Sequence, residues 1–133
     1  MTTPFGPQLI GETEKTLTAL LRRYLADTGL TEPQWVTLRV AQLYGAEDTA
    51  GLAAAVADRA HFPDARELVD AMTERGLLED GRLTTAGADV IASVLATSER
   101  QTGAIWRDHR AEDIEVTTRV LNDVLTRARV LLD

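Results

Sequence analysis

A single tight-hairpin signal interrupts a chain whose apolar residues otherwise recur at helical spacing. Within residues 77–84, the dipeptide Asp80-Gly81 stands between short apolar flanks, which is the pattern of a hairpin with minimal strands. Only four residues separate Leu78 from Leu83, so the strands and the turn are short. No other segment carries a β signal. A mainly α chain with one very short β-hairpin is therefore expected.

Helical periodicity predicts four helices before the hairpin. Pro33 stands in the first turn of the second helix, where its missing N–H does no harm, and apolar residues lie nearly all round this helix, which predicts its burial. Thr49 is expected to cap the third helix and Gly76 to close the fourth. The expected helices are about Leu9–Asp27, Glu32–Tyr44, a short helix from Thr49, and a fourth that Pro63 opens.

Two long helices are predicted from Thr85 onward, with a break near Asp108 to Ala111. The apolar stripe of the last helix continues to its final residues, where a small monomer has little left to cover it. We expect burial against a second copy around a two-fold axis, and the alternative is packing on the first helix of the same chain. The two stripes comprise Val90, Ile91, Val94, Leu95, Ile105 and Trp106, then Ile114, Thr117, Val120, Leu121, Val124, Ala128 and Leu131.

The composition restricts the chemistry that the chain can perform. Its 133 residues make one domain-sized unit and include no cysteine, which excludes disulfides, thiolate metal ligands and cysteine nucleophiles. No apolar stretch is long enough to cross a bilayer and no signal peptide is recognisable, so a cytoplasmic protein without a membrane partner is expected. The 21 acidic residues outnumber the 14 basic ones, which gives a net charge of −7.

Three short helices followed by a tight hairpin form the order of a winged helix-turn-helix, here with long helices on both sides. At this point the sequence resembles the multiple-antibiotic-resistance-regulator (MarR) family, over about Leu9 to Leu132. The segments that carry the resemblance are Leu30-Thr31-Glu32-Pro33-Gln34-Trp35, Leu68-Val69 with Met72-Thr73-Glu74-Arg75-Gly76-Leu77-Leu78, and Leu83-Thr84-Thr85-Ala86-Gly87.

The resemblance implies a single MarR-like domain over residues 1–133. It places a winged helix-turn-helix at about 31–84 and dimerisation helices at about 9–28 and 85–132. In the family, the fourth helix enters the DNA major groove, the hairpin touches the minor groove, and a small ligand tunes binding. The implied function is that of a homodimeric transcriptional regulator that binds double-stranded DNA.

Basic side chains in the implied DNA-binding unit are the candidate DNA contacts, since phosphate neutralisation supplies much of the affinity. Arg59, Arg66 and Arg75 are expected to contact phosphates or bases. Thr49, at a helix N-terminus, can assist a phosphate contact. Arg82 is either a minor-groove contact or an ordinary arginine beside the hairpin.

The charge of residues 31–83 works against DNA binding, because five basic residues stand against ten acidic ones. An acidic stripe on the fourth helix is either a solvated face or a surface that repels phosphates. An alternative function is a MarR-like dimer with lost or weak DNA binding, which binds a small molecule or a protein that it meets as a DNA mimic. The stripe is expected to hold Asp64, Glu67, Ala71 and Glu74, with Asp70 beside it.

A small aromatic or anionic ligand is implied at the junction of the winged-helix unit and the dimerisation helices, where the family binds its ligands. Arg39 would supply one cation to an apolar and aromatic wall. The alternative is that Tyr24 and Trp35 are ordinary core residues. The residues expected to line the site are Leu20, Tyr24, Trp35, Leu38 and Arg39.

Catalysis and metal binding have little support in the sequence. A zinc or iron site at His109 would need the nearby carboxylates of Asp108, Glu112 and Asp113, but their place at a helix break favours capping. His61 is likewise expected in a loop or cap. The sequence has no nucleophile elbow and no phosphate-binding glycine loop. We expect no enzyme, no metal and no cofactor.

Overall fold

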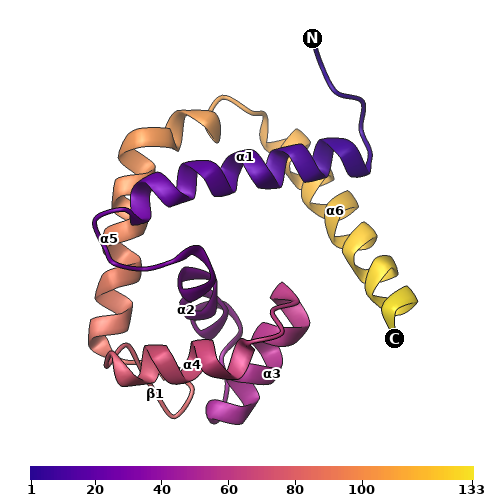
Figure 1. Cartoon of the computed structure of the whole chain (residues 1–133). Coiled ribbons are helices and arrows are strands. Elements are labelled where there is room, and N and C mark those ends of the chain that lie inside the picture. The colour runs from indigo at the N-terminus through magenta and orange to yellow at the C-terminus, as the bar shows by residue number, and fades with distance from the viewer. The chain divides into compact units, whose positions relative to one another are not determined.

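The structure is a computed structural model and describes residues 1–133. Six α-helices, one short 3₁₀ helix and a two-stranded hairpin follow one another (Figure 1). The chain divides into two compact units, residues 1–98 and residues 99–133. The elements are α1 (Pro7–Leu25), α2 (Glu32–Tyr44), α3 (Thr49–Ala60), α4 (Ala65–Glu74), β1 (Leu78–Glu79), β2 (Arg82–Leu83), α5 (Thr85–Thr102), η1 (Gly103–Ile105) and α6 (Ala111–Leu132).

The core of residues 1–98 joins side chains from five helices. Leu25 of α1 is almost fully buried, and Leu38 of α2, Leu52 of α3, Val69 of α4 and Ile91 of α5 are fully buried. These contacts hold α2, α3 and α4 together as one packed group that the hairpin follows. The predicted fold class is confirmed: the chain is a mainly α winged helix-turn-helix with a very short hairpin, flanked by long helices.

α2 begins and ends where the sequence predicts. The Thr31 hydroxyl accepts from the Gln34 N–H at 3.3 Å, and the Gln34 side chain accepts from the Thr31 N–H at 3.0 Å. This capping box satisfies two backbone donors at the helix start. Burial is less complete than predicted, because the buried residues end at Ala41 and the last turn leaves Leu43 and Tyr44 more than half exposed.

The cap of α3 and the start of α4 differ from the prediction. Asp48, and not Thr49, caps α3, since its carboxylate accepts from the Gly51 N–H at 2.7 Å. A carboxylate at a helix N-terminus also interacts favourably with the helix dipole, which explains its use in place of a hydroxyl. α4 begins two residues after Pro63, because Pro63 and Asp64 form a turn before it.

The hairpin is as short as the sequence predicts. Leu78 pairs with Leu83 and Glu79 with Arg82 in an antiparallel register. The two residues between the strands, Asp80 and Gly81, have φ values of 51° and 78°, as a two-residue hairpin turn requires. The hairpin therefore has no loop beyond its two turn residues.

Residues 99–133 form a bend and a long exposed helix. Gly103 starts the 3₁₀ helix η1, so the prediction that Ile105 and Trp106 continue the fifth helix is wrong. Gly103 is buried beneath the Glu99 side chain, and a Cβ at Gly103 would lie 2.5 Å from Glu99 Oε1. A side chain at position 103 would therefore have to displace the exposed Glu99 carboxylate, which is the flexible end of its side chain.

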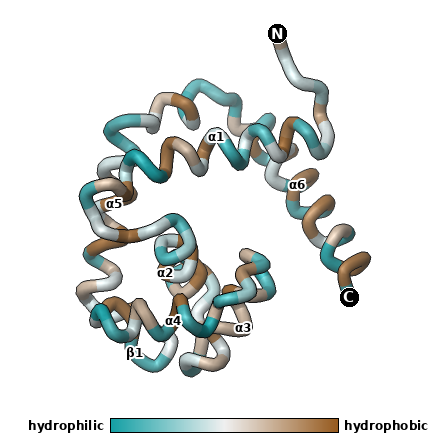
Figure 2. The backbone as a smooth tube through the Cα atoms, viewed as in Figure 1, coloured by the Kyte–Doolittle hydropathy of each residue, from teal (hydrophilic) through white to brown (hydrophobic).

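α6 has no buried residue. Hydrophobic and hydrophilic residues alternate along this helix (Figure 2). Ile114, Leu121 and Val124 of the predicted stripe are 46%, 39% and 42% exposed. Exposed apolar side chains repeated at this spacing indicate a surface that another helix can cover. Neither α6 nor any other helix combines the length and apolar character needed to cross a membrane.

Candidate nucleic-acid interface

α4 has one buried face and one exposed face. Its buried residues pack against α2 and α3, which turns the opposite face away from the core. Ala71 is partly buried against the core, so its assignment to the outward acidic stripe is wrong. The buried residues of α4 are Ala65, Leu68, Val69 and Met72, and the exposed ones are Arg66, Glu67, Asp70, Thr73 and Glu74.

One cation and three carboxylates occupy the exposed face of α4. Arg66 Nε donates to Asp70 Oδ1, one turn further along, at 3.1 Å. Both side chains are more than half exposed, so water screens their attraction and the pair is weak. With Glu67 and Glu74 added, the face carries a net negative charge.

Arg59 lies on an aromatic ring. Its guanidinium carbon is 3.4 Å from the centre of the Tyr44 ring, which is a cation–π contact between the last turn of α3 and the end of α2. Both residues are exposed. Stacking uses the flat face of a guanidinium and leaves N–H groups at its edge for an anion.

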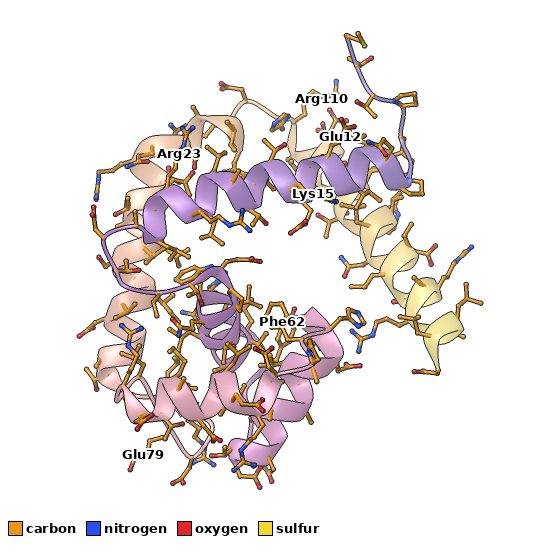
Figure 3. The ribbon with its side chains drawn as sticks, viewed as in Figure 1. Glu12, Lys15, Arg23, Phe62, Glu79 and Arg110 are labelled. Atoms are coloured by element: carbon orange, nitrogen blue, oxygen red, sulfur yellow. The ribbon has the colours of Figure 1, made fainter.

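Arg75 and Arg82 donate to backbone carbonyls that are far away in the sequence. Arg75 Nη1 donates to the Gly29 carbonyl at 3.2 Å, and Arg82 Nη2 donates to the Glu47 carbonyl at 3.3 Å. Glu79, paired with Arg82 across the hairpin, points away from the helices (Figure 3). Each of the four candidate arginines thus contacts its own chain while remaining exposed.

The start of α3 lies against the hairpin turn. A Cβ built on Gly81 would lie 2.2 Å from the Asp48 carbonyl oxygen and 3.1 Å from the Thr49 nitrogen. Gly81 is buried by this contact, and Thr49 is partly buried. Asp48 is a capping residue that was not predicted, although an aspartate three residues before Gly51 is itself an N-cap signal.

Four of the five residues expected to bind a ligand lie in the hydrophobic core or pack against it. Leu38 is fully buried, and Tyr24 and Trp35 are buried beside it, while Leu20 packs partly buried against the same cluster. The Arg39 guanidinium carbon lies 5.9 Å from the centre of the Trp35 ring. The structure therefore brings these five residues together as a packed group.

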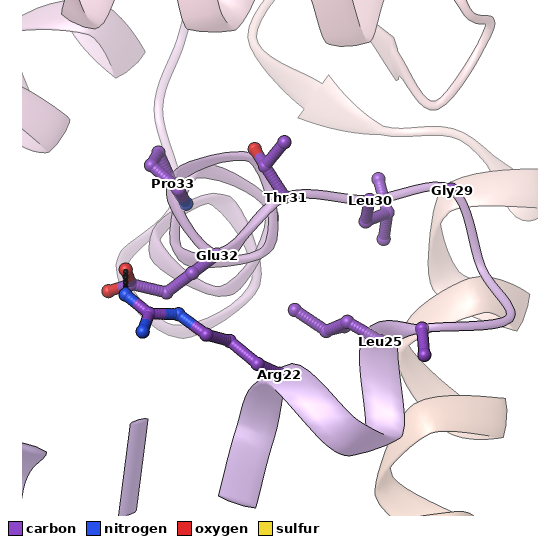
Figure 4. A pocket seen from close by; sticks show the side chains of 8 residues that line it. Arg22, Leu25, Gly29, Leu30, Thr31, Glu32 and Pro33 are labelled. Carbon is purple, nitrogen blue, oxygen red and sulfur yellow. Dashed lines mark ion pairs between the residues drawn. The ribbon is translucent and has the colours of Figure 1, made fainter. Parts of the chain in front are cut away.

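A hollow of about 470 Å³ opens between the end of α1 and the start of α2 (Figure 4). Arg22 reaches across it toward Glu32, with 3.9 Å between Nη2 and Oε2. The five residues expected to bind a ligand are absent from its wall. The hollow is lined by Arg22, Leu25, Ala26, Gly29, Leu30, Thr31, Glu32 and Pro33.

Both histidines lie at helix ends. His61 is the C-cap of α3, in the left-handed conformation with φ 58°. His109 Nε2 lies 3.1 Å from a backbone carbonyl oxygen one turn earlier. Beside it, Arg110 forms ion pairs with Glu112 at 3.5 Å and with Asp113 at 3.4 Å. His61 therefore caps α3 as expected, whereas no side-chain hydrogen bond caps the start of α6.

Comparison with known proteins identifies the fold. No family model and no curated protein matches the sequence. A solved structure described as a MarR family protein from Bacillus stearothermophilus is similar, with a TM-score of 0.58 and 22% identity, over 94% of this chain and 99% of that one. The chain therefore has a MarR-like winged-helix fold, and its function has to be argued from its own residues.

Proposed function

We propose that this chain is a MarR-like transcriptional regulator that binds double-stranded DNA as a homodimer. One observation carries the proposal: α4 is held on α2 and α3 by its apolar face, which leaves the opposite face exposed in a MarR-like winged-helix unit. A helix presented in this way fits the DNA major groove, which is about 12 Å wide. Two such helices related by a two-fold axis read a pseudo-palindromic site.

Arg66 is the central contact of the proposed interface, because it is the basic residue on the exposed face of α4. Its pair with Asp70 contributes on the order of 0–1 kcal/mol, so exchange of that carboxylate for a phosphate costs little. Arg59 and Arg75 lie at the ends of α3 and α4 and contact the flanking phosphates. Thr49, in the first turn of α3, assists a phosphate contact.

The proposed dimer uses the apolar stripe of α6. Burial of a stripe that includes Leu121 and Val124 against the same stripe of a second copy removes apolar surface from water, which stabilises by about 25 cal/mol per Å². A two-fold interface requires a self-complementary surface, and one long amphipathic helix provides it. In this proposal residues 1–133 act as one MarR-like domain that dimerises through its flanking helices.

The proposed ligand is a small aromatic or anionic molecule. Arg39 over Trp35 supports a cation beside an aromatic surface. The hollow, which these two residues do not line, supplies space and another cation, Arg22. An anion there competes with Glu32 for the Arg22 guanidinium. Benzoate is the simplest probe, and we expect it to raise the melting temperature of the protein but not of Arg22→Ala.

A second candidate function is favoured by the charge of the exposed face of α4. A MarR-like dimer that presents Glu67, Asp70 and Glu74 outward can dock a basic protein in place of DNA. The two candidates predict opposite effects of neutralisation. Glu67→Gln with Glu74→Gln strengthens DNA binding if the first function is right, and weakens binding of a basic protein partner if the second is right.

The direct test of the proposed interface is the salt dependence of DNA binding by Arg66→Ala. If Arg66 of each subunit contacts a phosphate, the slope of log K against log salt for the dimer becomes shallower by about 1.8, which is about 0.9 for each subunit. Arg23→Ala is the matched control, since Arg23 is an exposed arginine of α1 outside the proposed interface (Figure 3). An equal slope for Arg66→Ala and Arg23→Ala removes Arg66 from the interface.

A further inference from the structure

We propose that the hairpin of this protein positions the start of α3 and makes no contact with DNA, so that Arg82 is a positioning residue of the interface. The inference rests on the proposed DNA-binding function. It assigns to Arg82 a partner within the chain, the backbone of Glu47, where a hairpin that enters the minor groove would offer a cation to the DNA.

The first observation is the close fit of the turn. Gly81 lies so near Asp48 that any side chain at position 81 would overlap the Asp48 carbonyl. Since Gly81 is one of the two turn residues, the hairpin already ends at the surface of the loop before α3. The contact buries Gly81, and the two-residue turn has no longer tip that could enter a groove.

The second observation is the direction of the hairpin's one cation. Arg82 is the basic residue of residues 78–83, and its Nη2 donates across to the Glu47 carbonyl. Arg82 and Gly81 therefore hold two successive residues of the same loop, Glu47 and Asp48. The Asp48 carboxylate then caps α3, so the hairpin fixes the residue that starts this helix.

The third observation is the charge of the turn. Glu79 and Asp80 are exposed acidic residues at the end of the hairpin. The minor groove has a negative potential, which attracts arginine and repels carboxylates. Insertion of this turn into a minor groove would place two carboxylates near the phosphates. The one guanidinium of the hairpin already donates to the Glu47 carbonyl.

The first arm of the test uses the protein without DNA. Hydrogen exchange over residues 46–53 is compared in the wild type, Arg82→Ala, Arg82→Lys and Arg23→Ala. We expect exchange in this segment to be severalfold faster in Arg82→Ala only, since a lysine still donates to a carbonyl. Unchanged exchange in Arg82→Ala overturns the positioning role, whether or not the protein binds DNA.

The second arm measures DNA affinity against salt for Arg82→Ala and Arg66→Ala. We expect Arg82→Ala to weaken binding about two- to fivefold, as loss of one hydrogen bond does, with the wild-type salt slope, and Arg82→Lys to restore affinity. A slope that falls by about 1.8 in Arg82→Ala, which is about 0.9 for each subunit of the dimer, shows a phosphate contact and overturns the inference. Absence of DNA binding by the wild type contradicts the proposed function, and the first arm still decides the positioning role.

Discussion

Asp70 holds the guanidinium of Arg66 on the exposed face of α4, with 3.1 Å between Oδ1 and Nε. The pair joins the basic residue of that face to one of its three carboxylates. A phosphate that approaches Arg66 has to displace Asp70 or share the guanidinium with it. If the proposed function is right, Asp70 therefore has the largest effect on whether this face attracts or repels a DNA phosphate.

Asp70→Asn is expected to strengthen DNA binding. The substitution removes a negative charge from the exposed face of α4 in each subunit and releases Arg66 for a phosphate, so the salt slope of the dimer steepens by up to about 1.8. Fluorescence anisotropy with a labelled duplex at several salt concentrations measures both quantities. Asp27→Asn is the control, because Asp27 is an exposed carboxylate just after α1 and its loss changes the net charge equally. Equal effects of the two substitutions contradict a specific role of Asp70.

Gly81→Ala is expected to destabilise the fold more than Gly76→Ala. Both glycines have nearly the same left-handed φ, 78° and 77°, so both substitutions cost about 1–2 kcal/mol in backbone strain. Position 76 has open space around an added Cβ, whereas at position 81 the Cβ meets the Asp48 carbonyl, which adds about 1–3 kcal/mol. Urea denaturation gives both free energies of unfolding. A difference near zero would show that the turn does not lie against Asp48.

Leu38→Ala is expected to lower the free energy of unfolding by about 2–5 kcal/mol, because Leu38 is fully buried and its loss leaves a cavity. Leu43→Ala is the control on the same helix, since Leu43 is 57% exposed and should change stability by at most about 0.5 kcal/mol. Thermal or urea denaturation separates the two variants. Similar losses in both would contradict the position of α2 in the core.

Leu121→Asp is expected to dissociate the proposed dimer. A carboxylate in the middle of the buried stripe loses its hydration without gaining a partner, which opposes association. Light scattering should report about 29 kDa for the wild type, twice the chain mass of 14.5 kDa, and one chain mass for the variant. Val116→Asp, at an exposed position of α6 outside the predicted stripe, serves as the control. A wild-type monomer, or a dimer that survives Leu121→Asp, contradicts the proposed interface.

Local signals made most of the fold predictable from the sequence. Thr31 and Gln34 complete a capping box around Pro33, so the start of α2 is encoded within four residues. The dipeptide Asp80-Gly81 likewise encodes a two-residue turn, because both residues tolerate positive φ. Asp48 and Thr49 stand side by side and both can cap a helix, so the wrong one was predicted as the cap of α3. The first helix was predicted at about Leu9–Asp27, and α1 spans Pro7–Leu25.

Contacts between distant segments made the candidate site harder to predict. The Glu47 carbonyl is 35 residues from Arg82, and the Gly29 carbonyl is 46 residues from Arg75. No local pattern shows that these arginines have partners, because a backbone carbonyl exists at every residue. The bend at Gly103 was also not predicted, because the apolar spacing of Ile105 and Trp106 continues the pattern of the fifth helix beyond its observed end at Thr102.

The measurement that tests the central claim most directly is DNA retention by the purified protein. A pool of fragments from its own genomic neighbourhood is offered at low and at physiological salt, and retained fragments are sequenced. We predict specific retention of a pseudo-palindromic fragment that survives physiological salt, because the two α4 helices of a dimer then bind DNA despite the acidic residues around them. No retention even at low salt, where attraction between arginine and phosphate is strongest, would contradict the DNA-binding function.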